Sequence, residues 1–237
     1  PFLNPEQAGA QNPAEMRRPD AAEIRKLHEI CPVGLVSLAI ELEGAIDFIC
    51  ELGGMGIVTS AAHSAATFDD YLKAREAGLT HLTHYCNQMS RLHHREIGLV
   101  GAALLDDGIG IELIADTIHL CEDMLRIVFK HRSCDQIMLI TDSIAASHLG
   151  DGEYPLGDSR IFVKDGVARI AAGNLAGSTL QFHQALANVA RISGLPLSEL
   201  IKTCSFNQAK SLGFTDRGAL EPGLLADIVL MDSDFQV

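Results

Sequence analysis

The sequence predicts an α/β protein built around a parallel sheet. From Leu35 onward, short apolar runs alternate with segments of helical periodicity, which is the pattern of repeated strand-helix units. The chain has 237 residues, 47% of them apolar, and can therefore bury a sizeable core. About five strands of this type can be counted, whereas a closed (β/α) barrel needs about eight. The pattern therefore predicts either an open α/β sheet or part of a barrel.

The first half of this pattern predicts three strands and two helices. Gly53-Gly54 ends the first helix, and Thr67 is the expected N-cap of the second, which Gly78 terminates. The strands are expected at residues 35–40, 55–59 and 81–85, and the helices at residues 42–52 and 67–76.

The second half adds two strands of the parallel type, after which the periodicity changes. Residues 160–170, with Asp165-Gly166 at their centre, predict a β-hairpin. The last apolar run, residues 226–231, follows the turn Glu221-Pro222-Gly223. The other elements expected here are strands at 110–115 and 136–141 and helices at 122–131, 178–192 and 197–212.

Composition narrows the possible partners and the compartment. The formal charge of -13 repels polyanions, so no nucleic-acid partner is expected. The apolar runs are far shorter than the roughly 20 residues of a membrane helix, so no membrane association is expected. Six scattered cysteines without a CxxC pair favour a reducing cytoplasm over a disulfide framework.

Three polar residues lie at or just after the carboxyl ends of apolar runs: His63, His84 and Asp142. In parallel α/β architectures, ligands and catalytic groups gather at this end of the strands. Imidazoles and a carboxylate suit a Zn²⁺ or Fe²⁺ ion. Each residue also has an ordinary structural explanation, as a hydrogen-bonded histidine or a helix cap. The spacing alone leaves both interpretations open.

Several segments, in order along essentially the whole chain, resemble motifs of the N-acetylglucosamine-6-phosphate deacetylases. Residues 62–67 are similar to GHSxAT, 83–89 to THxxNAM, 93–99 to HHREPGL, 114–119 to IADGIH, 139–142 to the aspartate-bearing strand, 175–180 to LAGSTL and 218–227 to GxLxPGxxAD.

This resemblance implies a metal-dependent (β/α)8 barrel of the amidohydrolase superfamily, incomplete in this chain, with part of a small β-sandwich. The expected segments are a barrel portion at 1–152, a β-hairpin insertion at 153–174, barrel helices at 175–215 and one or more sandwich strands at 216–237.

The implied activity is hydrolysis of the acetamido group of N-acetylglucosamine 6-phosphate to glucosamine 6-phosphate and acetate. By resemblance, His63 and His84 are ligands of one or two divalent metal ions, and Asp142 is the general base and acid. A divalent cation lowers the pKa of bound water and polarises the acetyl carbonyl. Asp142 would accept the water proton and return it to the departing amine.

The same resemblance implies residues that hold the substrate. His119 matches the histidine that bonds the sugar, while Asn87, the amide of Gln88 and Arg95 match phosphate-binding positions. The family's arginine can reach a neighbouring subunit, which implies a homodimer.

Two further positions are expected near the substrate. Leu175, in the segment similar to LAGSTL, is an expected substrate contact. Gln11 matches a position that contacts the acetyl group or a water on the metal; a loop amide that bonds backbone is an equally good explanation.

The sequence also departs from the family pattern. The chain starts at Pro1-Phe2, so the glutamate ligand of the family's EGPF segment and the earlier HxH strand are absent, and we expect an incomplete metal site. Gln88 and Thr117 differ from the usual Ala and Gly, which makes N-acetylgalactosamine 6-phosphate a second candidate substrate. Ile97 and Gln208 stand where the family has Pro.

Two other functions stay open at this point. One is an amidohydrolase acting on a cyclic amide or nucleobase. That activity would not explain the loop with Arg95, which matches a phosphate-binding position. The other is a catalytically incomplete fragment that serves as a folded or subunit-pairing module.

Overall fold

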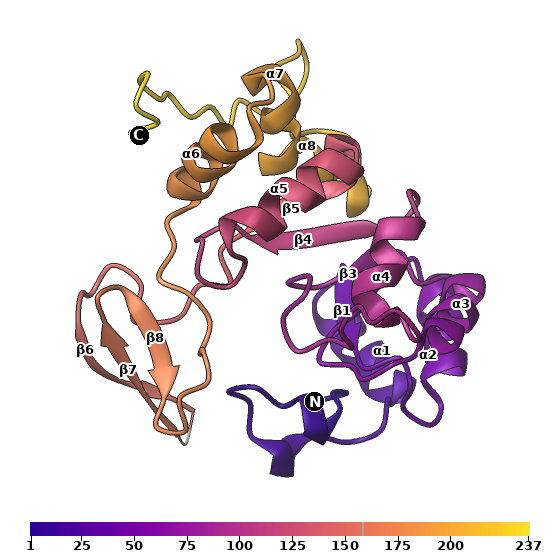
Figure 1. Cartoon of the computed structure of the whole chain (residues 1–237). Helices are drawn as coiled ribbons and strands as arrows, with labels where there is room; N and C mark the ends of the chain where they lie inside the picture. Colours follow the sequence, from indigo (N-terminus) through magenta and orange to yellow (C-terminus); the bar gives the residue numbers. More distant parts are fainter. Residues whose placement is uncertain (158) are drawn as a thin grey trace. The chain divides into compact units, whose positions relative to one another are not determined.

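The main sheet of the computed structural model has five strands that follow one another in chain order (Figure 1). The pairs β1–β2, β2–β3 and β3–β4 are parallel. A doubly wound sheet reverses its strand order part-way, whereas neighbours in a (β/α) barrel are consecutive. The order therefore identifies part of a barrel, as the resemblance implied. The strands are β1 (Leu35–Leu38), β2 (Val58–Ala61), β3 (His81–Leu82), β4 (Gly110–Ile114) and β5 (Ile137–Ile140).

One helix lies between each pair of consecutive strands. These helices are α2 (Ala45–Gly54), α3 (Phe68–Ala77), α4 (Gly98–Leu105) and α5 (Glu122–His131), and α3 packs against both α2 and α4. The predicted N-cap is confirmed, because Thr67 and Asp70 form a capping box, and Gly78 ends α3 in a left-handed conformation. The predicted helix 122–131 coincides with α5.

Two strands differ from their predicted bounds because of local backbone conformation. The prediction for β3 ran to Tyr85, but His84 and Cys86 have φ angles of 34° and 76°, which end the extended chain. Strand β2 starts at Val58 rather than Met55, since the chain turns at Gly56 after α2.

Two helices were not predicted. Helix α1 (Ala21–Ile30) is capped by Asp20, whose side chain accepts hydrogen bonds from two backbone N–H groups. Helix α4 contains only apolar residues and glycine and is largely buried, so no amphipathic pattern marks it. Two 3₁₀ turns, η1 (Pro5–Gln7) and η2 (Pro13–Glu15), precede α1.

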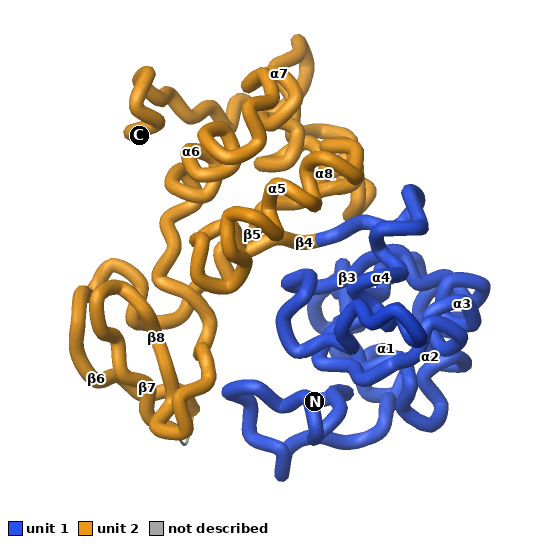
Figure 2. The backbone as a smooth tube through the Cα atoms, in the orientation of Figure 1, with its two compact units in different colours: residues 1–111 blue, residues 112–237 orange. Residues whose placement is uncertain are grey.

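The structure describes residues 1–157 and 159–237 and divides them into two compact units, Pro1–Ile111 and Glu112–Val237 (Figure 2). Residue 158, within the predicted insertion 153–174, lies outside the described residues. The domain boundaries predicted from the sequence stay predictions. The part of the chain that the structure describes contains no helix with the length and hydropathy of a membrane span.

The second unit carries the predicted β-hairpin within a larger antiparallel sheet. Strands β6 (Gly152–Leu156), β7 (Ser159–Lys164) and β8 (Val167–Ile170) pair in this order (Figure 1). The β7–β8 loop is Asp165-Gly166, both with positive φ, as a two-residue hairpin turn requires. The hairpin prediction is therefore confirmed, with β6 as an additional strand.

The helices that follow are shorter than predicted. Helix α6 (Phe182–Ser193) starts after a capping box at Gln181. The predicted helix 197–212 is broken at Ser205, whose ψ is -46° and φ -154°. It forms α7 (Leu197–Leu200), the 3₁₀ turn η4 (Ile201–Cys204) and α8 (Phe206–Ser211); another such turn, η3 (Cys134–Gln136), precedes β5.

The last segment has no regular structure. Residues 216–237 contain no assigned strand, and the apolar run there is exposed, with Leu230 at 83% of its full accessibility. A strand needs a neighbouring strand to pair with. The β-sandwich expected for this segment stays a prediction.

A buried histidine at the start of β3 makes the stability depend on pH. Burial, with a smaller contribution from the Arg75 guanidinium, lowers the pKa of His81 from 6.5 to about 4. The unfolded chain therefore binds more protons between these values, and stability falls as the pH drops from about 6.5 to about 4. A shift of this size corresponds to at most about 3 kcal/mol.

We expect His81→Gln to lose less stability than the parent between pH 7 and pH 4.5, as measured by urea unfolding. His131→Gln, at an exposed histidine, is the control and should follow the parent. Equal losses in the parent and His81→Gln would contradict the prediction.

Candidate active site

The parallel register brings two histidines together at the ends of β2 and β3. Ala61 pairs with Leu82, and His63 and His84 each lie two residues further along. Their ring centroids are 4.8 Å apart, with the ring planes at 81°. His84 is buried and His63 half-buried. The predicted juxtaposition of these two imidazoles is thus present in the first unit.

The loops that carry these residues adopt an uncommon backbone conformation. Nine non-glycine residues of the described chain have clearly positive φ, and six of them lie within the motif segments that carry the expected site. Such residues cost on the order of 1–3 kcal/mol each and persist where surrounding contacts hold them. The six residues within the motif segments are His63, His84, Cys86, Gln88, Thr117 and Asp142.

A backbone carbonyl from the N-terminal segment fixes the orientation of one ring. His63 Nδ1 lies 2.7 Å from the carbonyl oxygen of Gln7. A carbonyl only accepts hydrogen bonds, so Nδ1 carries the proton and Nε2 carries the lone pair of the neutral ring. Histidines that bind metals are commonly oriented in this way.

The first unit therefore offers two imidazole donors that fit a divalent ion. Among the described residues, no group of three or more His, Cys, Asp or Glu side chains is close enough to hold a metal. Catalytic zinc sites usually use three protein ligands.

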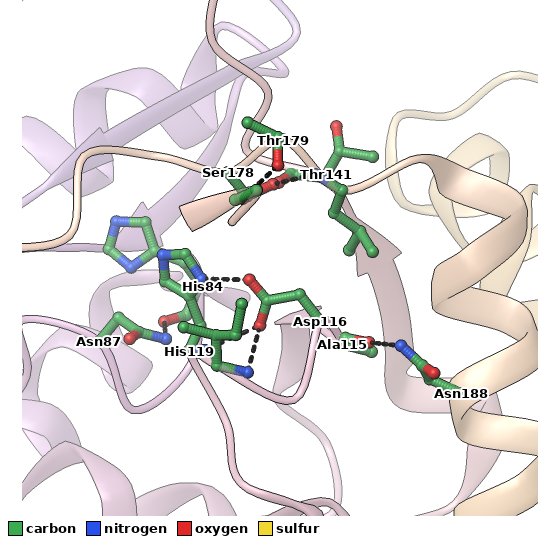
Figure 3. Close-up of polar contacts among 12 residues, drawn as sticks. His84, Asn87, Ala115, Asp116, His119, Thr141, Ser178, Thr179 and Asn188 are labelled. Atoms are coloured by element: carbon green, nitrogen blue, oxygen red, sulfur yellow. Dashed lines mark hydrogen bonds and ion pairs between the residues drawn. The ribbon is translucent and has the colours of Figure 1, made fainter. Parts of the chain in front are cut away.

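The expected phosphate-binding amides lie on the loop after β3. Asn87 Nδ2 lies 3.2 Å from the carbonyl oxygen of His84 and 3.3 Å from that of Tyr85, contacts that keep its side chain against its own loop (Figure 3). The carbonyl of Gln88 accepts a hydrogen bond from the Ser64 amide. This bond joins the loops after β2 and β3.

Arg95 and Gln11 are both exposed. Arg95 donates from Nη1 to His94 Nε2 at 2.6 Å. The neighbouring Glu96 does not pair with Arg95; its carboxylate accepts hydrogen bonds from the backbone N–H groups of Phe68 and Gly98. The Gly98 and Phe68 hydrogen bonds lower the pKa of Glu96. Gln11 donates its backbone N–H to the carbonyl of Ala8.

In the second unit, His119 is oriented by a carboxylate that the sequence analysis did not single out. Asp116 Oδ2 lies 2.6 Å from His119 Nδ1, and Asp116 Oδ1 accepts the backbone N–H groups of Ile118 and His119 (Figure 3). Burial tends to raise the pKa of Asp116, but the His119 side chain and these backbone bonds outweigh it, so the net shift is downward. Asp116 thus fixes the ring of the expected sugar-binding histidine.

Asp142 lies two residues after the end of β5 and is exposed. Its backbone has φ 50°, and its carbonyl accepts a 2.8 Å hydrogen bond from the Ser178 amide. Ser178 Oγ also donates to the carbonyl of Thr141 (Figure 3). The segment similar to LAGSTL therefore lies beside Asp142 and holds its backbone.

Leu175 lies earlier in the same segment and is half-buried, forming an isolated bridge with Arg169. Its expected contact with substrate stays a prediction, as does the combination of His119 and Asp142 with His63 and His84 in one site.

Comparison with known proteins identifies the family. A model of the amidohydrolase family matches residues 39–237. The chain belongs to the amidohydrolase family. The resemblance to N-acetylglucosamine-6-phosphate deacetylases is confirmed by relatives and solved structures that cover the chain.

Two curated relatives of this amidohydrolase differ in the sugar that their names give. The N-acetylglucosamine-6-phosphate deacetylase of Lysinibacillus sphaericus is 36% identical over 98% of this chain and 60% of the relative. The N-acetylgalactosamine-6-phosphate deacetylase of Escherichia coli is also 36% identical, over 100% of this chain and 63% of the relative. The chain thus spans less than two thirds of these relatives.

Solved structures agree with the fold of the amidohydrolase chain. N-acetylglucosamine-6-phosphate deacetylase from Thermotoga maritima matches with a TM-score of 0.92 at 42% identity, covering 99% of this chain and 64% of the other. A mutant of the Mycobacterium smegmatis deacetylase in complex with N-acetyl-D-glucosamine-6-phosphate matches with a TM-score of 0.94 at 33% identity, covering 99% and 63%.

The close approach of the loop to Asp142 requires glycine at position 177. A Cβ there would lie 2.5 Å from Ile144 Cγ2 and 2.8 Å from the Asp142 carbonyl oxygen, and the φ of Gly177 is +59°. We expect Gly177→Ala to lower the free energy of unfolding by about 3 kcal/mol or more, since steric overlap adds to the cost of positive φ.

Gly194→Ala is the matched control, because Gly194 has φ +66° but no neighbour within 4 Å of an added Cβ. It should cost only about 1–2 kcal/mol. Chemical denaturation of both variants tests the difference, and equal losses would show that overlap with Ile144 and the Asp142 carbonyl contributes nothing.

Proposed function

We propose that this chain carries most of the catalytic part of a metal-dependent N-acetylhexosamine-6-phosphate deacetylase, with N-acetylglucosamine 6-phosphate as the substrate. The observation that supports it best is the pair His63 and His84 at adjacent strand ends, whose ring centroids are 4.8 Å apart. Deacetylases of this substrate class match almost the whole chain in sequence and structure.

His63 and His84 would supply two of the protein ligands to one or two divalent ions, Zn²⁺ or Fe²⁺. When bound, such an ion lowers the pKa of water and polarises the acetyl carbonyl. The family as a whole supports metal dependence; the identity and number of ions are part of the proposal.

Asp142 would perform the proton transfers of the reaction. Water adds to the carbonyl carbon, and the Asp142 carboxylate accepts the proton that the water loses. The carbon–nitrogen bond then breaks, and Asp142 returns the proton to the departing amine. The products are acetate and a hexosamine 6-phosphate. Asp142 is exposed at the end of β5, which suits a group that must reach substrate.

The remaining expected residues would hold the sugar phosphate. Arg95 offers a planar guanidinium for the phosphate, and Asn87 and Gln88 offer side-chain and backbone amides. His119, whose ring is fixed by Asp116, would hydrogen-bond the sugar. Leu175 and Gln11 are the other proposed contacts.

N-acetylgalactosamine 6-phosphate is the second candidate substrate. A relative named for this activity is as similar to the chain, at 36% identity, as a relative named for the glucosamine epimer. Gln88 and Thr117, two departures from the family pattern, both have positive φ in loops of the expected site. Rates on the two epimers, compared side by side, distinguish the candidates.

The assembly and compartment belong to the same proposal. We propose a homodimer in which Arg95 reaches the neighbouring subunit, consistent with its exposure. Six free cysteines support the cytoplasm as the compartment. The proposed parts are a barrel portion at 1–152, an insertion at 153–174, barrel helices at 175–215 and sandwich strands at 216–237.

The alternative is a catalytically incomplete fragment, since His63 and His84 would supply two ligands and catalytic zinc sites usually use three. Metal analysis and acetate release from this chain separate the two. If the chain binds metal and releases acetate, the enzyme is supported. If it does neither, the fragment is supported. Release of product from cyclic amides or nucleobases instead would support another amidohydrolase activity.

Asp142→Asn should lower the rate of acetate release by about 10²–10⁴-fold, because it removes the proton acceptor. Bound metal, measured by elemental analysis, should be unchanged. Asp123→Asn, at a highly exposed aspartate on α5, is the control and should leave the rate as it is. A rate for Asp142→Asn within a few fold of the parent would exclude Asp142 as the base.

Arg95→Ala should raise the KM for the phosphorylated substrate by about 10–100-fold, since a charge-assisted hydrogen bond to phosphate contributes about 1.5–3 kcal/mol. The unphosphorylated N-acetylhexosamine should be turned over equally by parent and variant. Arg91→Ala, at another exposed arginine of the same loop, controls for loss of charge. Equal effects on both substrates would argue against a phosphate contact.

A further inference from the structure

Glu41, three residues after the end of β1, accepts hydrogen bonds from two different segments of the first unit. Oε1 accepts from Asn4 Nδ2 at 2.7 Å and from the Ala65 amide at 2.6 Å. Oε2 accepts from Ser64 Oγ at 2.5 Å. One partly buried carboxylate therefore links the N-terminal segment to the loop after β2.

The loop contacts fall on the two residues that follow His63. The φ angle of His63 is 45°, which an L-residue adopts only where its surroundings hold it. The neighbouring backbone is fixed on one side by the bond from Ala62 to the Leu38 carbonyl and on the other by Glu41. Glu41 therefore stabilises the backbone from which the imidazole projects.

The N-terminal contact falls on the turn that orients the ring. Asn4 caps η1, since its Oδ1 accepts from the Glu6 amide at 2.9 Å, and its carbonyl accepts from the Gln7 amide. Its Nδ2 is the group that donates to Glu41. The carbonyl of Gln7, at the end of this turn, accepts the Nδ1 proton of His63.

We infer that Glu41 is a positioning residue for His63: it fixes both the loop that carries the ring and the turn whose carbonyl selects the Nδ1–H tautomer. It does not touch the reacting atoms. The inference rests on the proposed function only in that the lone pair on Nε2 is then directed to a metal ion. Groups that orient metal-binding histidines typically contribute 10- to 100-fold in metal affinity.

The decisive measurement is the tautomer of His63 in the metal-free full chain, from the ¹⁵N chemical shifts of its ring. His63→Gln assigns the signal among the ten histidines of the chain. The parent should show the Nδ1–H form. Glu41→Ala should show a mixture of tautomers, and Co²⁺ affinity, measured by absorption titration, should fall about 10- to 100-fold.

Two further variants separate positioning from general destabilisation. Glu41→Gln keeps an Oε1 acceptor for Asn4 and Ala65 and an amide beside the Ser64 hydroxyl, so it should restore the parent tautomer. Asn4→Asp keeps the cap of η1 but removes the donor to Glu41, and should show the tautomer mixture even if Glu41→Ala does not fold.

Glu43→Ala, at a 72% exposed side chain paired with Arg18, is the control and should match the parent. A parent-like tautomer in Glu41→Ala or Asn4→Asp, or a Glu41→Gln variant as perturbed as Glu41→Ala, would overturn the inference. If the variants change the tautomer as expected but the parent releases no acetate, the proposed function is wrong and this role of Glu41 remains.

Discussion

The arrangement of the candidate site depends on the parallel register between β2 and β3. Ala61 pairs with Leu82, and His63 and His84 each follow their strand residue by two positions. The register therefore places these two histidines next to each other. The loops stay paired beyond the strands through a bridge between Ser64 and Met89. A slip of one residue would separate the imidazoles and turn every side chain of the strand to the opposite face.

Beyond the strands, hydrogen bonds from distant segments hold backbone conformations that the local sequence disfavours. The N-terminal segment forms only 3₁₀ turns, yet its Gln7 carbonyl and Asn4 side chain act on the loop of His63 and on Glu41. In the second unit, the Ser178 amide holds the Asp142 backbone by a hydrogen bond, and Gly177 allows this close approach. In both units, therefore, residues far away in the sequence support the backbone of an expected catalytic or metal-binding group.

The sequence predicted those parts of the fold that local physics determines. The capping box at Thr67 and the bounds of α5 follow from nearby residues, as does the Asp165-Gly166 turn. Helix α4 escaped prediction because its burial leaves it without a polar face. The histidine pair was predicted from strand ends, but the role of Glu41 was not, since its partners lie 23, 24 and 37 residues away. Asp142 was singled out because it is an acidic residue that follows an apolar run. The same signal is present at Glu41 and could have identified it.

The side chains of α8 also affect the outer strand of the sheet. Asn207 donates to the carbonyls of Cys134 and Ile137, and Gln208 to the carbonyl of Leu139. Among the described residues β5 is the last strand in the sheet order, and the backbone groups along such an edge can pair with a strand of another molecule. The two amides occupy acceptors that such a strand would need. Asn207 and Gln208 thus leave fewer backbone acceptors of β5 open to another strand.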